Sequence, residues 1–289
     1  MSADEAEEAH IALLTGGRVR VAASGVGDGR GLFLTAPVAA GETVFVEQPL
    51  VCAPAEFGMW ECICHACLQR ESDAAQLTVC QRCRWAHFCS AACAAAGAAA
   101  HTEAECEAMV RLRYRREDHP GTVLLAARLL RVLHAGGASE PARAAQAALA
   151  QTLVGSSPML PPLTLRRFEA WAPTVLALAG CDAAAADAVA ALCRLLRNEF
   201  KVQDERDVAA GAALYPAVAR ANHAGEPNGR ARAEGWALRL EALAPLAAGE
   251  ELRLSYVEEA APAAERAAHL RARFLFDCAC GAPSCASLC

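Results

Sequence analysis

The spacing of hydrophobic positions changes character along the chain. Short alternating or β-branched runs, separated by glycines, occupy the first fifty residues. They predict strands at 18–24, 31–35 and 42–47. From about residue 107 the chain is rich in Ala and Leu at helical spacing, with breaks at glycine and proline. This region predicts four helices, at about 121–135, 140–154, 164–179 and 183–197.

The alternating pattern returns after the helical region. Apolar residues alternate with polar ones over 236–242 and again over 250–256, which predicts two strands. The Pro and Gly residues of 245–249 predict the turn between them. A charged helix is expected over 263–274, and Pro173 is expected to kink or split the third helix of the Ala-rich region.

Composition limits the classes of function. The 289 residues suffice for a sizeable core with a small module inserted into a larger fold. A net charge of −6 disfavours direct nucleic-acid binding, which needs a basic face. We expect no membrane span and no signal peptide, because apolar runs are interrupted by charges and the first residues are acidic. Fifteen cysteines without a secretory signal indicate metal ligation in a reducing compartment, the nucleus or the cytoplasm.

The segment 64–106 contains seven cysteines and one histidine in closely spaced pairs. Zn²⁺ takes four S and N ligands in a tetrahedron, and two residues separated by two or three others can reach one metal. The spacing permits an interleaved pair of sites, in which the metals supply folding free energy that so short a segment lacks. The two predicted ligand sets are Cys64, Cys67, Cys89 and Cys93, and Cys80, Cys83, His101 and Cys106.

The end of the chain offers a third metal site with four thiolates. The alternative is a frayed tail with idle cysteines, since one ligand is the last residue. The four are Cys278, Cys280, Cys285 and Cys289. The remaining cysteines are expected to be small apolar residues rather than reactive thiols, namely Cys52, Cys62, Cys181 and Cys193.

The segment around Phe88-Cys89-Ser-Ala-Ala-Cys93 resembles a MYND zinc finger. That finger has two C-x2-C pairs, an aromatic-Cys-x3-Cys element and a late His and Cys. Here four residues separate His101 from Cys106 where three are usual, and a helix would turn the two side chains apart. A RING ubiquitin ligase is the competing interpretation, but it would place a Cys-x-His element in the middle of the segment.

Motifs later in the chain resemble the SET domain of protein lysine methyltransferases. They are Gly29-Arg-Gly31, Arg197-Asn-Glu-Phe200, Asn222-His-Ala-Gly-Glu-Pro-Asn228 and Gly249-Glu-Glu-Leu-Arg-Leu-Ser-Tyr256. Each motif alone is weak, but their order and spacing are specific in combination. With the inserted finger and the cysteine-rich tail, residues 18–289 resemble the SET and MYND domain family.

The resemblance implies an α+β fold: a SET-type, β-rich arrangement of small sheets with an inserted MYND finger, a helical insertion and a post-SET tail. The implied divisions are 1–17, an acidic N-terminal segment; 18–61, the first part of the SET domain; 62–106, the finger; 107–196, the helical insertion; 197–260, the second part of the SET domain; and 261–289, the zinc-binding tail.

The resemblance also implies S-adenosylmethionine as methyl donor and a protein lysine as acceptor. Tyr256 would lie beside the transferring methyl group as the catalytic residue. Phe200 and Phe274 would line the lysine channel, where π faces favour a methylammonium. The cofactor would be bound by Gly29, Arg30, Gly31, Asn198, Asn222, His223, Tyr256 and Phe276. Each of these residues also has an ordinary structural interpretation, as a turn, a buried histidine or core packing.

The chain departs from the family pattern at further positions. Gly225 stands where a zinc-binding cysteine is expected, and loss of one thiolate weakens a closed zinc site unless Cys289 replaces it. Glu258 is a conservative change of an acidic residue. Phe274 replaces a frequent tyrosine, and the missing hydroxyl is expected to alter how many methyl groups are added.

Two functions follow from these observations. The first is a lysine N-methyltransferase acting on a histone or non-histone protein, with two zinc ions in the finger and one in the tail. The second is a non-catalytic scaffold whose finger binds proline-rich peptides, an interpretation motivated by Ala224, Gly225 and the long His101–Cys106 spacing. We expect a monomer without membrane contact in either case.

Overall fold

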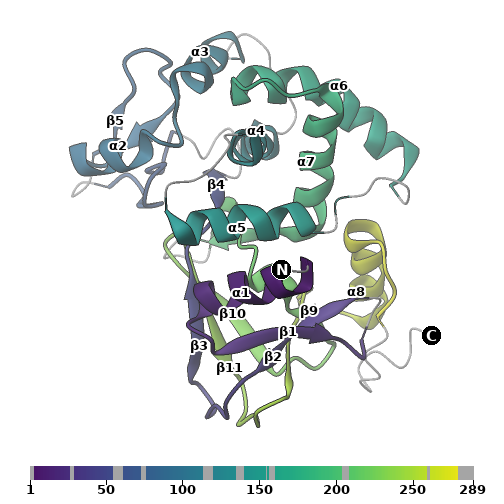
Figure 1. Ribbon diagram of the computed structural model, residues 1–289. Helices are drawn as coiled ribbons and strands as arrows, with labels where there is room; N and C mark the ends of the chain where they lie inside the picture. The colour runs from purple at the N-terminus through teal and green to yellow at the C-terminus, as the bar shows by residue number, and fades with distance from the viewer. Residues whose placement is uncertain are drawn as a thin grey trace. The chain divides into compact units, whose positions relative to one another are not determined.

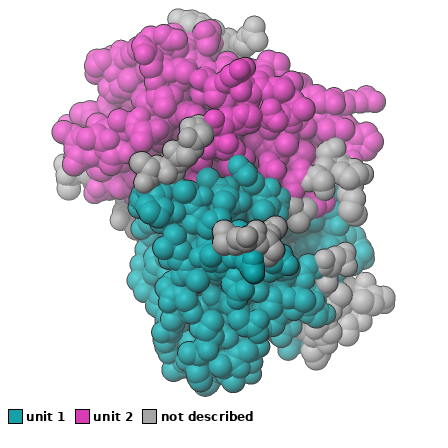
Figure 2. Space-filling model, viewed as in Figure 1, with its two compact units in different colours: residues 1–48, 139–153, 215–289 teal, residues 49–138, 154–214 magenta. Residues whose placement is uncertain are grey.

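The computed structural model of the chain describes residues 3–26, 29–54, 61–72, 76–112, 120–134, 140–153, 155, 160–203, 208–258 and 261–278. The chain forms two compact units, each built from discontinuous segments (Figure 2). Unit 1 comprises residues 1–48, 139–153 and 215–289, and unit 2 comprises residues 49–138 and 154–214.

Unit 1 contains two small sheets (Figure 1). The first has the order β1-β2-β12-β9, from Val19–Ala23, Arg30–Leu34, Glu251–Leu254 and Asn222–His223. The second has the order β10-β11-β3, from Gly229–Glu234, Ala237–Ala242 and Thr43–Glu47. β12 pairs antiparallel with β2 and parallel with β9, so a late segment of the chain lies between two distant ones. Leu32 and Leu252 pair across this junction and are fully buried.

Helices complete unit 1. They are α1 (Ala3–Thr15), α5 (Pro141–Thr152), the short 3₁₀ helix η2 (Val218–Arg220), α8 (Ala263–His269) and the π-helical segment η3 (Leu270–Phe274). α1 packs against β1 and lies beside α5 (Figure 1). Ile11 of α1 is fully buried. Glu7, one turn earlier, lies on the same face of the helix and is also buried.

A buried glutamate joins three of these elements. Glu47, at the end of β3, accepts hydrogen bonds from the backbone amides of Ala217 and Val218 at 3.1 and 2.9 Å. Gln146 of α5 donates to the same carboxylate at 3.1 Å. Burial nevertheless raises the pKa of Glu47 to about 7. This carboxylate therefore fixes the segment that leads into β9.

The raised pKa of Glu47 predicts a pH-dependent stability. A carboxyl group with a folded-state pKa above its unfolded value stabilises the fold below the unfolded pKa and loses that contribution as pH rises through the folded pKa. Between pH 4.5 and about 7 this amounts to about 3 kcal/mol at most. Denaturant unfolding across this range should show a smaller fall in stability for Glu47→Gln than for the wild type. Glu250→Gln, at an exposed position, should follow the wild type.

Unit 2 contains a sheet of order β4-β8-β7 and a group of helices. The strands are Val51–Pro54, Ala209–Leu214 and Glu199–Gln203, and the helices are α3 (Glu103–Leu112), α4 (Pro120–His134), α6 (Pro162–Ala179) and α7 (Ala185–Asn198). A two-stranded hairpin, β5 (Thr78–Val79) and β6 (His87–Phe88), precedes the short helix α2 (Ala91–Gly97). α4 packs against α6 and α7, and Leu124 and Leu129 are among its fully buried residues.

The structure confirms the mixed α+β class with small sheets and most of the predicted elements. All four helices of the Ala-rich region are present, and α6 continues through Pro173 without splitting. α1 was not predicted, because the acidic segment 1–17 carries no strong apolar stripe. β4, β7, β8 and β10 were also missed. Within the described residues, no helix combines the length and apolar character needed to cross a bilayer.

Candidate functional site

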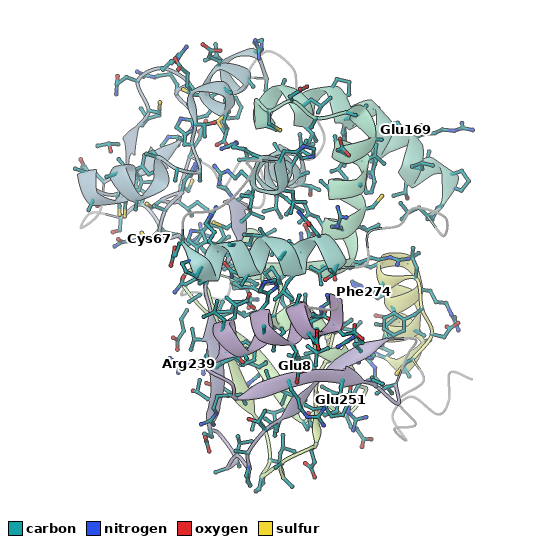
Figure 3. The ribbon with its side chains drawn as sticks, in the orientation of Figure 1. Glu8, Cys67, Glu169, Arg239, Glu251 and Phe274 are labelled. Carbon is teal, nitrogen blue, oxygen red and sulfur yellow. The ribbon has the colours of Figure 1, made fainter. Side chains whose placement is uncertain are left out.

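Four segments of unit 1 meet around the carboxylate of Glu251, which is labelled in Figure 3. Its Oε1 accepts hydrogen bonds at 2.8 Å from the hydroxyl of Ser24 and from Nδ2 of Asn222. The Asn222 amide also donates to the carbonyl of Arg30 at 3.3 Å. The end of β1, the start of β2, β9 and β12 are therefore held together by polar side chains.

Asn228 provides a second clamp on β12. Its Nδ2 donates to the carbonyl of Glu251, and its Oδ1 accepts from the amide of Arg253, both at 2.8 Å. An asparagine side chain can mimic a strand in this way because it offers one donor and one acceptor. Both asparagines of the 222–228 motif thus fix backbone positions.

Gly31 allows the closest approach in this cluster. A Cβ at this position would lie 2.1 Å from Oε1 of Glu251 and 2.9 Å from Nδ2 of Asn222. No real Cβ tolerates such distances, so the Asn222–Glu251 hydrogen bond depends on glycine here.

Gly31→Ala is expected to break the Asn222–Glu251 contact and to lower the free energy of unfolding by about 1–3 kcal/mol. Thermal or urea unfolding measures this loss. Gly25→Ala is the matched control, because nothing lies within 4 Å of a Cβ there. Equal stability of the two variants would show that Glu251 can move away at no cost.

Aromatic rings gather around Tyr256. Its ring centroid lies 4.9 Å from that of Phe274, which is labelled in Figure 3, and 6.2 Å from that of Phe276. The His223 ring lies 5.4 Å from Tyr256 and 6.0 Å from Phe276. The guanidinium of Arg273 stacks on Phe274 at 5.5 Å. The structure thus brings together three of the aromatic side chains singled out from the sequence, along with His223.

Hydrogen bonds hold both the side chain and the backbone of Tyr256. Its hydroxyl donates to the carbonyl of Ala221 at 2.6 Å, and its backbone amide donates to Nδ1 of His223 at 3.1 Å. Burial raises the pKa of Tyr256, so the phenol is protonated at neutral pH. Burial also lowers the pKa of His223 to about 4. The imidazole is therefore neutral, with Nδ1 as acceptor and the proton on Nε2.

Arg30 differs from its neighbour Gly31 in its surroundings. Its guanidinium binds Asp4 and Glu7 of α1, while its backbone carbonyl faces Asn222. Successive residues of a strand point to opposite faces of the sheet, which accounts for the difference. Gly29 begins the same segment, and nothing lies within 4 Å of a Cβ there.

Two expected site residues lie in unit 2 and are described only within it. Asn198 is the last residue of α7, and its Nδ2 donates to the carbonyl of Arg194 at 2.8 Å. Phe200 lies on β7, paired with Ala213 of β8. Their proposed roles beside Tyr256 remain predictions.

Eight cysteine and histidine side chains of unit 2 form two clusters, with the same grouping that the sequence predicts. Within each cluster the ligand atoms all lie within 4.8 Å of one another. None of the described cysteines is disulfide-bonded. The clusters are Cys64, Cys67, Cys89 and Cys93, and Cys80, Cys83, His101 and Cys106.

The distances within the clusters suit zinc. A tetrahedral Zn²⁺ with Zn–S bonds of about 2.3 Å has its sulfurs about 3.8 Å apart. The Sγ atoms of Cys89 lie 3.6 Å from Cys67 and 3.5 Å from Cys93. In the second cluster Cys80 and Cys106 are 3.8 Å apart. Both donor sets therefore match the size and chemistry of the ion.

The long spacing between His101 and Cys106 does not separate these ligands. α3 begins at Glu103, so His101 precedes the helix while Cys106 lies in its first turn. Nε2 of His101 lies 3.6 Å from Sγ of Cys83. The expected divergence of the two side chains would require both residues to lie in one helix, whereas His101 lies before α3 begins.

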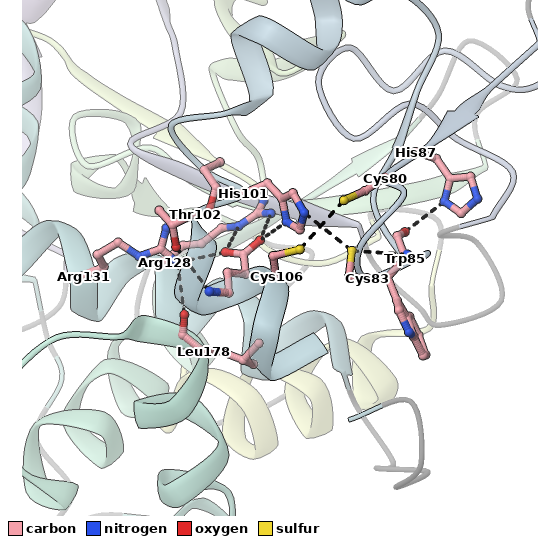
Figure 4. Close-up of polar contacts among 12 residues, drawn as sticks. Cys80, Cys83, Trp85, His87, His101, Thr102, Cys106, Arg128, Arg131 and Leu178 are labelled. Atoms are coloured by element: carbon pink, nitrogen blue, oxygen red, sulfur yellow. Dashed lines mark hydrogen bonds and ion pairs between the residues drawn. The ribbon is translucent and has the colours of Figure 1, made fainter. Parts of the chain in front are cut away.

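His101 is oriented by a buried carboxylate (Figure 4). Its Nδ1 lies 3.4 Å from Glu105, which also accepts hydrogen bonds from Arg128 at 2.7 and 3.1 Å and from Arg131 at 2.9 Å. Burial alone would raise the pKa of Glu105, but the charge of Arg128 and the bond to His101 hold it at about 2. A carboxylate behind a histidine ligand fixes the ring and the tautomer. The second cluster is thereby tied to α4.

Glu105→Gln is expected to weaken metal binding at the second cluster by about 10- to 100-fold, because it removes the charge that orients His101. Competition with a chromogenic chelator measures this affinity. Glu107→Gln is the matched control, since Glu107 is half exposed and pairs only with Arg82 among the described contacts. Equal affinity of the two variants would refute the orienting role.

The tail cluster falls mostly outside the described residues. Cys278 is described and partly buried, while Cys280, Cys285 and Cys289 lie outside the described ranges. The third zinc site therefore stays a prediction.

Similarity to known proteins agrees with these features. No protein-family model matches the chain. Human histone-lysine N-methyltransferase SMYD3 (Homo sapiens) is 26% identical over 257 residues, which cover 87% of this chain and 58% of that protein. N-lysine methyltransferase SMYD2-B of Danio rerio is 27% identical over 265 residues, covering 88% and 57%. Over most of its length the chain is similar to SET and MYND domain lysine methyltransferases.

The fold of the chain has a counterpart among solved structures. The structure of Rubisco LSMT bound to AdoMet aligns with 96% of this chain and 56% of its own, at a TM-score of 0.50 and 12% identity. Identity this low indicates a shared fold alone. The chain also spans less than three fifths of the length of the two curated relatives described above.

The sequence analysis did not single out three carboxylates that have structural partners. Glu7 binds Arg30, Glu105 orients His101, and Glu251 joins Ser24 to Asn222. Glu251 lies within a motif used for the resemblance, but nothing in the motif indicates its partners, which lie up to 227 residues away. Glu7 could have been found from its helical spacing with Asp4 and Ile11.

Proposed function

We propose that the chain is an S-adenosylmethionine-dependent protein lysine N-methyltransferase that acts on a histone or non-histone protein. The observation that carries the proposal is the convergence of Tyr256, His223, Phe274 and Phe276 in one unit. The side chain of Asn222 in β9 donates to the carbonyl of Arg30 at the start of β2, so two segments that carry sequence motifs are joined in the same unit. Homology to lysine methyltransferases supports the assignment.

The aromatic cluster suits cationic ligands. The methyl donor is a sulfonium and the product is a methylammonium, and both are attracted to π faces. The neutral His223 adds no repelling charge. The protonated Tyr256 has oxygen lone pairs that can face a positive centre. These properties favour methyl transfer over chemistry that needs a strong general base.

The reaction requires alignment rather than acid–base machinery. When bound, S-adenosylmethionine would supply an electrophilic methyl group: the N–CH₃ bond to lysine would form as the S–CH₃ bond breaks, S-adenosylhomocysteine would leave, and the nitrogen would lose its proton to water. Tyr256, held by Ala221 and His223, orients the reacting groups. Phe274 forms a wall of the lysine channel, and Phe200 is proposed as another.

The proposed cofactor contacts follow the motif residues. Gly29, Gly31 and the backbone of Arg30 would lie along the amino-acid end of the donor, and Phe276 near the adenine. The side chains of Asn222 and His223 are engaged with the protein, so we assign them to positioning the backbone around the donor. Asn198 is proposed as a further contact.

Each cluster of the finger is proposed to hold one Zn²⁺. At Cys80, burial raises the pKa of the thiol, but the backbone amide of Cys83 and the ring of His101 lower it to about 6, which favours the thiolate that metal binding needs. A third zinc is proposed for the tail cysteines.

A transfer assay tests the proposal. The zinc-loaded chain is incubated with methyl-labelled S-adenosylmethionine and an array of lysine-containing peptides and intact histones. Label is expected on lysine, with none on the same peptides carrying arginine at that position. Absence of label on every lysine substrate, with the donor shown to bind, would contradict the proposal.

A non-catalytic scaffold is the second candidate, motivated by Ala224 and Gly225. Ala224 is buried and its amide donates to the carbonyl of Leu254 at 2.9 Å, so this departure is accommodated within the sheet. A proline-rich peptide captured by the chain and lost in Cys89→Ser, from a protein that binds no methyl donor, would favour the scaffold.

A further inference from the structure

The N-terminal helix carries a buried carboxylate with no role in the proposed reaction. Glu7, in the second turn of α1, is 8% exposed, whereas its neighbour Glu8, labelled in Figure 3, is exposed. Burying a carboxylate without partners costs a large free energy, so the groups that pair with Glu7 indicate its role.

Glu7 binds two arginines from different segments. Oε2 lies 3.1 Å from Nε of Arg30, and Oε1 lies 2.5 Å from Nη2 of Arg220. The Arg220 guanidinium also binds the hydroxyl of Thr152 at the end of α5. Asp4, whose side chain is mostly exposed to solvent, also forms an ion pair with Arg30. One carboxylate therefore lies between two cations that would otherwise repel each other.

Both arginines directly precede residues of the candidate site. Arg30 is followed by Gly31, and its own carbonyl accepts the Asn222 amide. Arg220 is followed by Ala221, whose carbonyl accepts the Tyr256 hydroxyl, and then by Asn222. The two backbone stretches 29–31 and 220–222 thus carry the site, and each is anchored to the same side chain of α1.

We propose that Glu7 is a positioning residue: the N-terminal helix clamps the two stretches 29–31 and 220–222 through Arg30 and Arg220, and so holds the methyl-donor site in shape. The link to the donor rests on the proposed function, whereas the clamp itself does not. On this account α1 supports the site through Glu7.

The physical reason lies in burial. Without the Glu7 carboxylate, the mostly buried guanidinium of Arg220 loses its one carboxylate partner among the described contacts, and Arg30 keeps only Asp4, so both stretches should loosen. Displacements of about 1 Å in a reaction site lower rates by as much as about 100-fold, so a loosened clamp should be visible in binding and turnover.

The clamp is tested first by hydrogen exchange on the zinc-loaded full chain without ligand. In Glu7→Gln, amides of 29–32 and 220–224 should exchange about tenfold faster, while those of β10 and β11 should not change. Glu8→Gln should match the wild type. Asp4→Asn changes an exposed side chain, so the variant is expected to fold. It should speed the exchange of amides 29–32 only, because Asp4 binds Arg30 and not Arg220 among the described contacts.

The consequence for the site is tested with S-adenosylhomocysteine as the probe. Glu7→Gln should raise its Kd about 10- to 100-fold at a temperature where circular dichroism shows the variant folded. A residue that only stabilises the helix would lower Tm and leave this Kd unchanged.

Unchanged exchange in Glu7→Gln overturns the clamp. Faster exchange with the wild-type Kd overturns the positioning role. Faster exchange in a chain whose wild type binds no S-adenosylhomocysteine supports the clamp and overturns the methyltransferase proposal instead.

Discussion

Removal of metal from the two cysteine clusters is expected to unfold residues 61–112. The elements of this segment are small: β5 and β6 have two residues each, and α2 has no buried residue. Structural zinc contributes about 10 kcal/mol or more to the folding of such modules. Addition of a strong zinc chelator should abolish exchange protection of this segment, and metal analysis should give two zinc ions for it.

Cysteine substitutions separate ligands from other thiols. Cys83→Ser should lose one metal and the protection of the surrounding loops, because a serine hydroxyl is a poor zinc ligand. Cys181→Ser is the control, since Cys181 lies outside both clusters. Retention of the fold and of both metals in Cys83→Ser would contradict the assignment.

Tyr256→Phe is expected to lower kcat for methyl transfer by about 100- to 1,000-fold with the fold intact. The change removes the hydroxyl that binds Ala221 and presents oxygen lone pairs beside the reacting groups. Losses of this size accompany removal of a preorganised hydrogen-bonding group in other enzymes. Single-turnover transfer, with circular dichroism and S-adenosylhomocysteine binding measured on the same samples, checks the prediction.

Tyr215→Phe is the matched control. The Tyr215 hydroxyl donates to the carbonyl of Trp236 at 2.5 Å and is fully buried. Its loss should lower stability and leave the turnover of folded protein unchanged. Identical kcat in Tyr256→Phe and the wild type would remove Tyr256 from the mechanism.

The helical region was predictable because local signals agree with tertiary packing. Repeated Ala and Leu at helical spacing, ended by Gly180 in the left-handed region, define α6 directly. β8 was missed because Ala209–Leu214 contains no β-branched or aromatic residue. Its strand conformation comes from pairing with β4 and β7, which the local sequence does not encode.

The grouping of eight cysteine and histidine side chains into two clusters was predictable residue by residue, because interleaved spacing leaves few arrangements for two tetrahedral ions. The positions of Asn222 and Tyr256 followed from motif order. The carboxylates that hold Asn222 and His101 did not, since a single Glu gives no indication of which side chains will pair with it in the fold. Glu251 and Glu105 became visible only once the strands and helices had brought their partners together.

A binding isotherm for S-adenosylmethionine on the zinc-loaded chain tests the central claim most directly. Saturable binding in the micromolar range, displaced by S-adenosylhomocysteine and weakened in Gly31→Ala, is the predicted result. No binding at millimolar concentration would contradict the assignment of a methyl-donor site beside Tyr256.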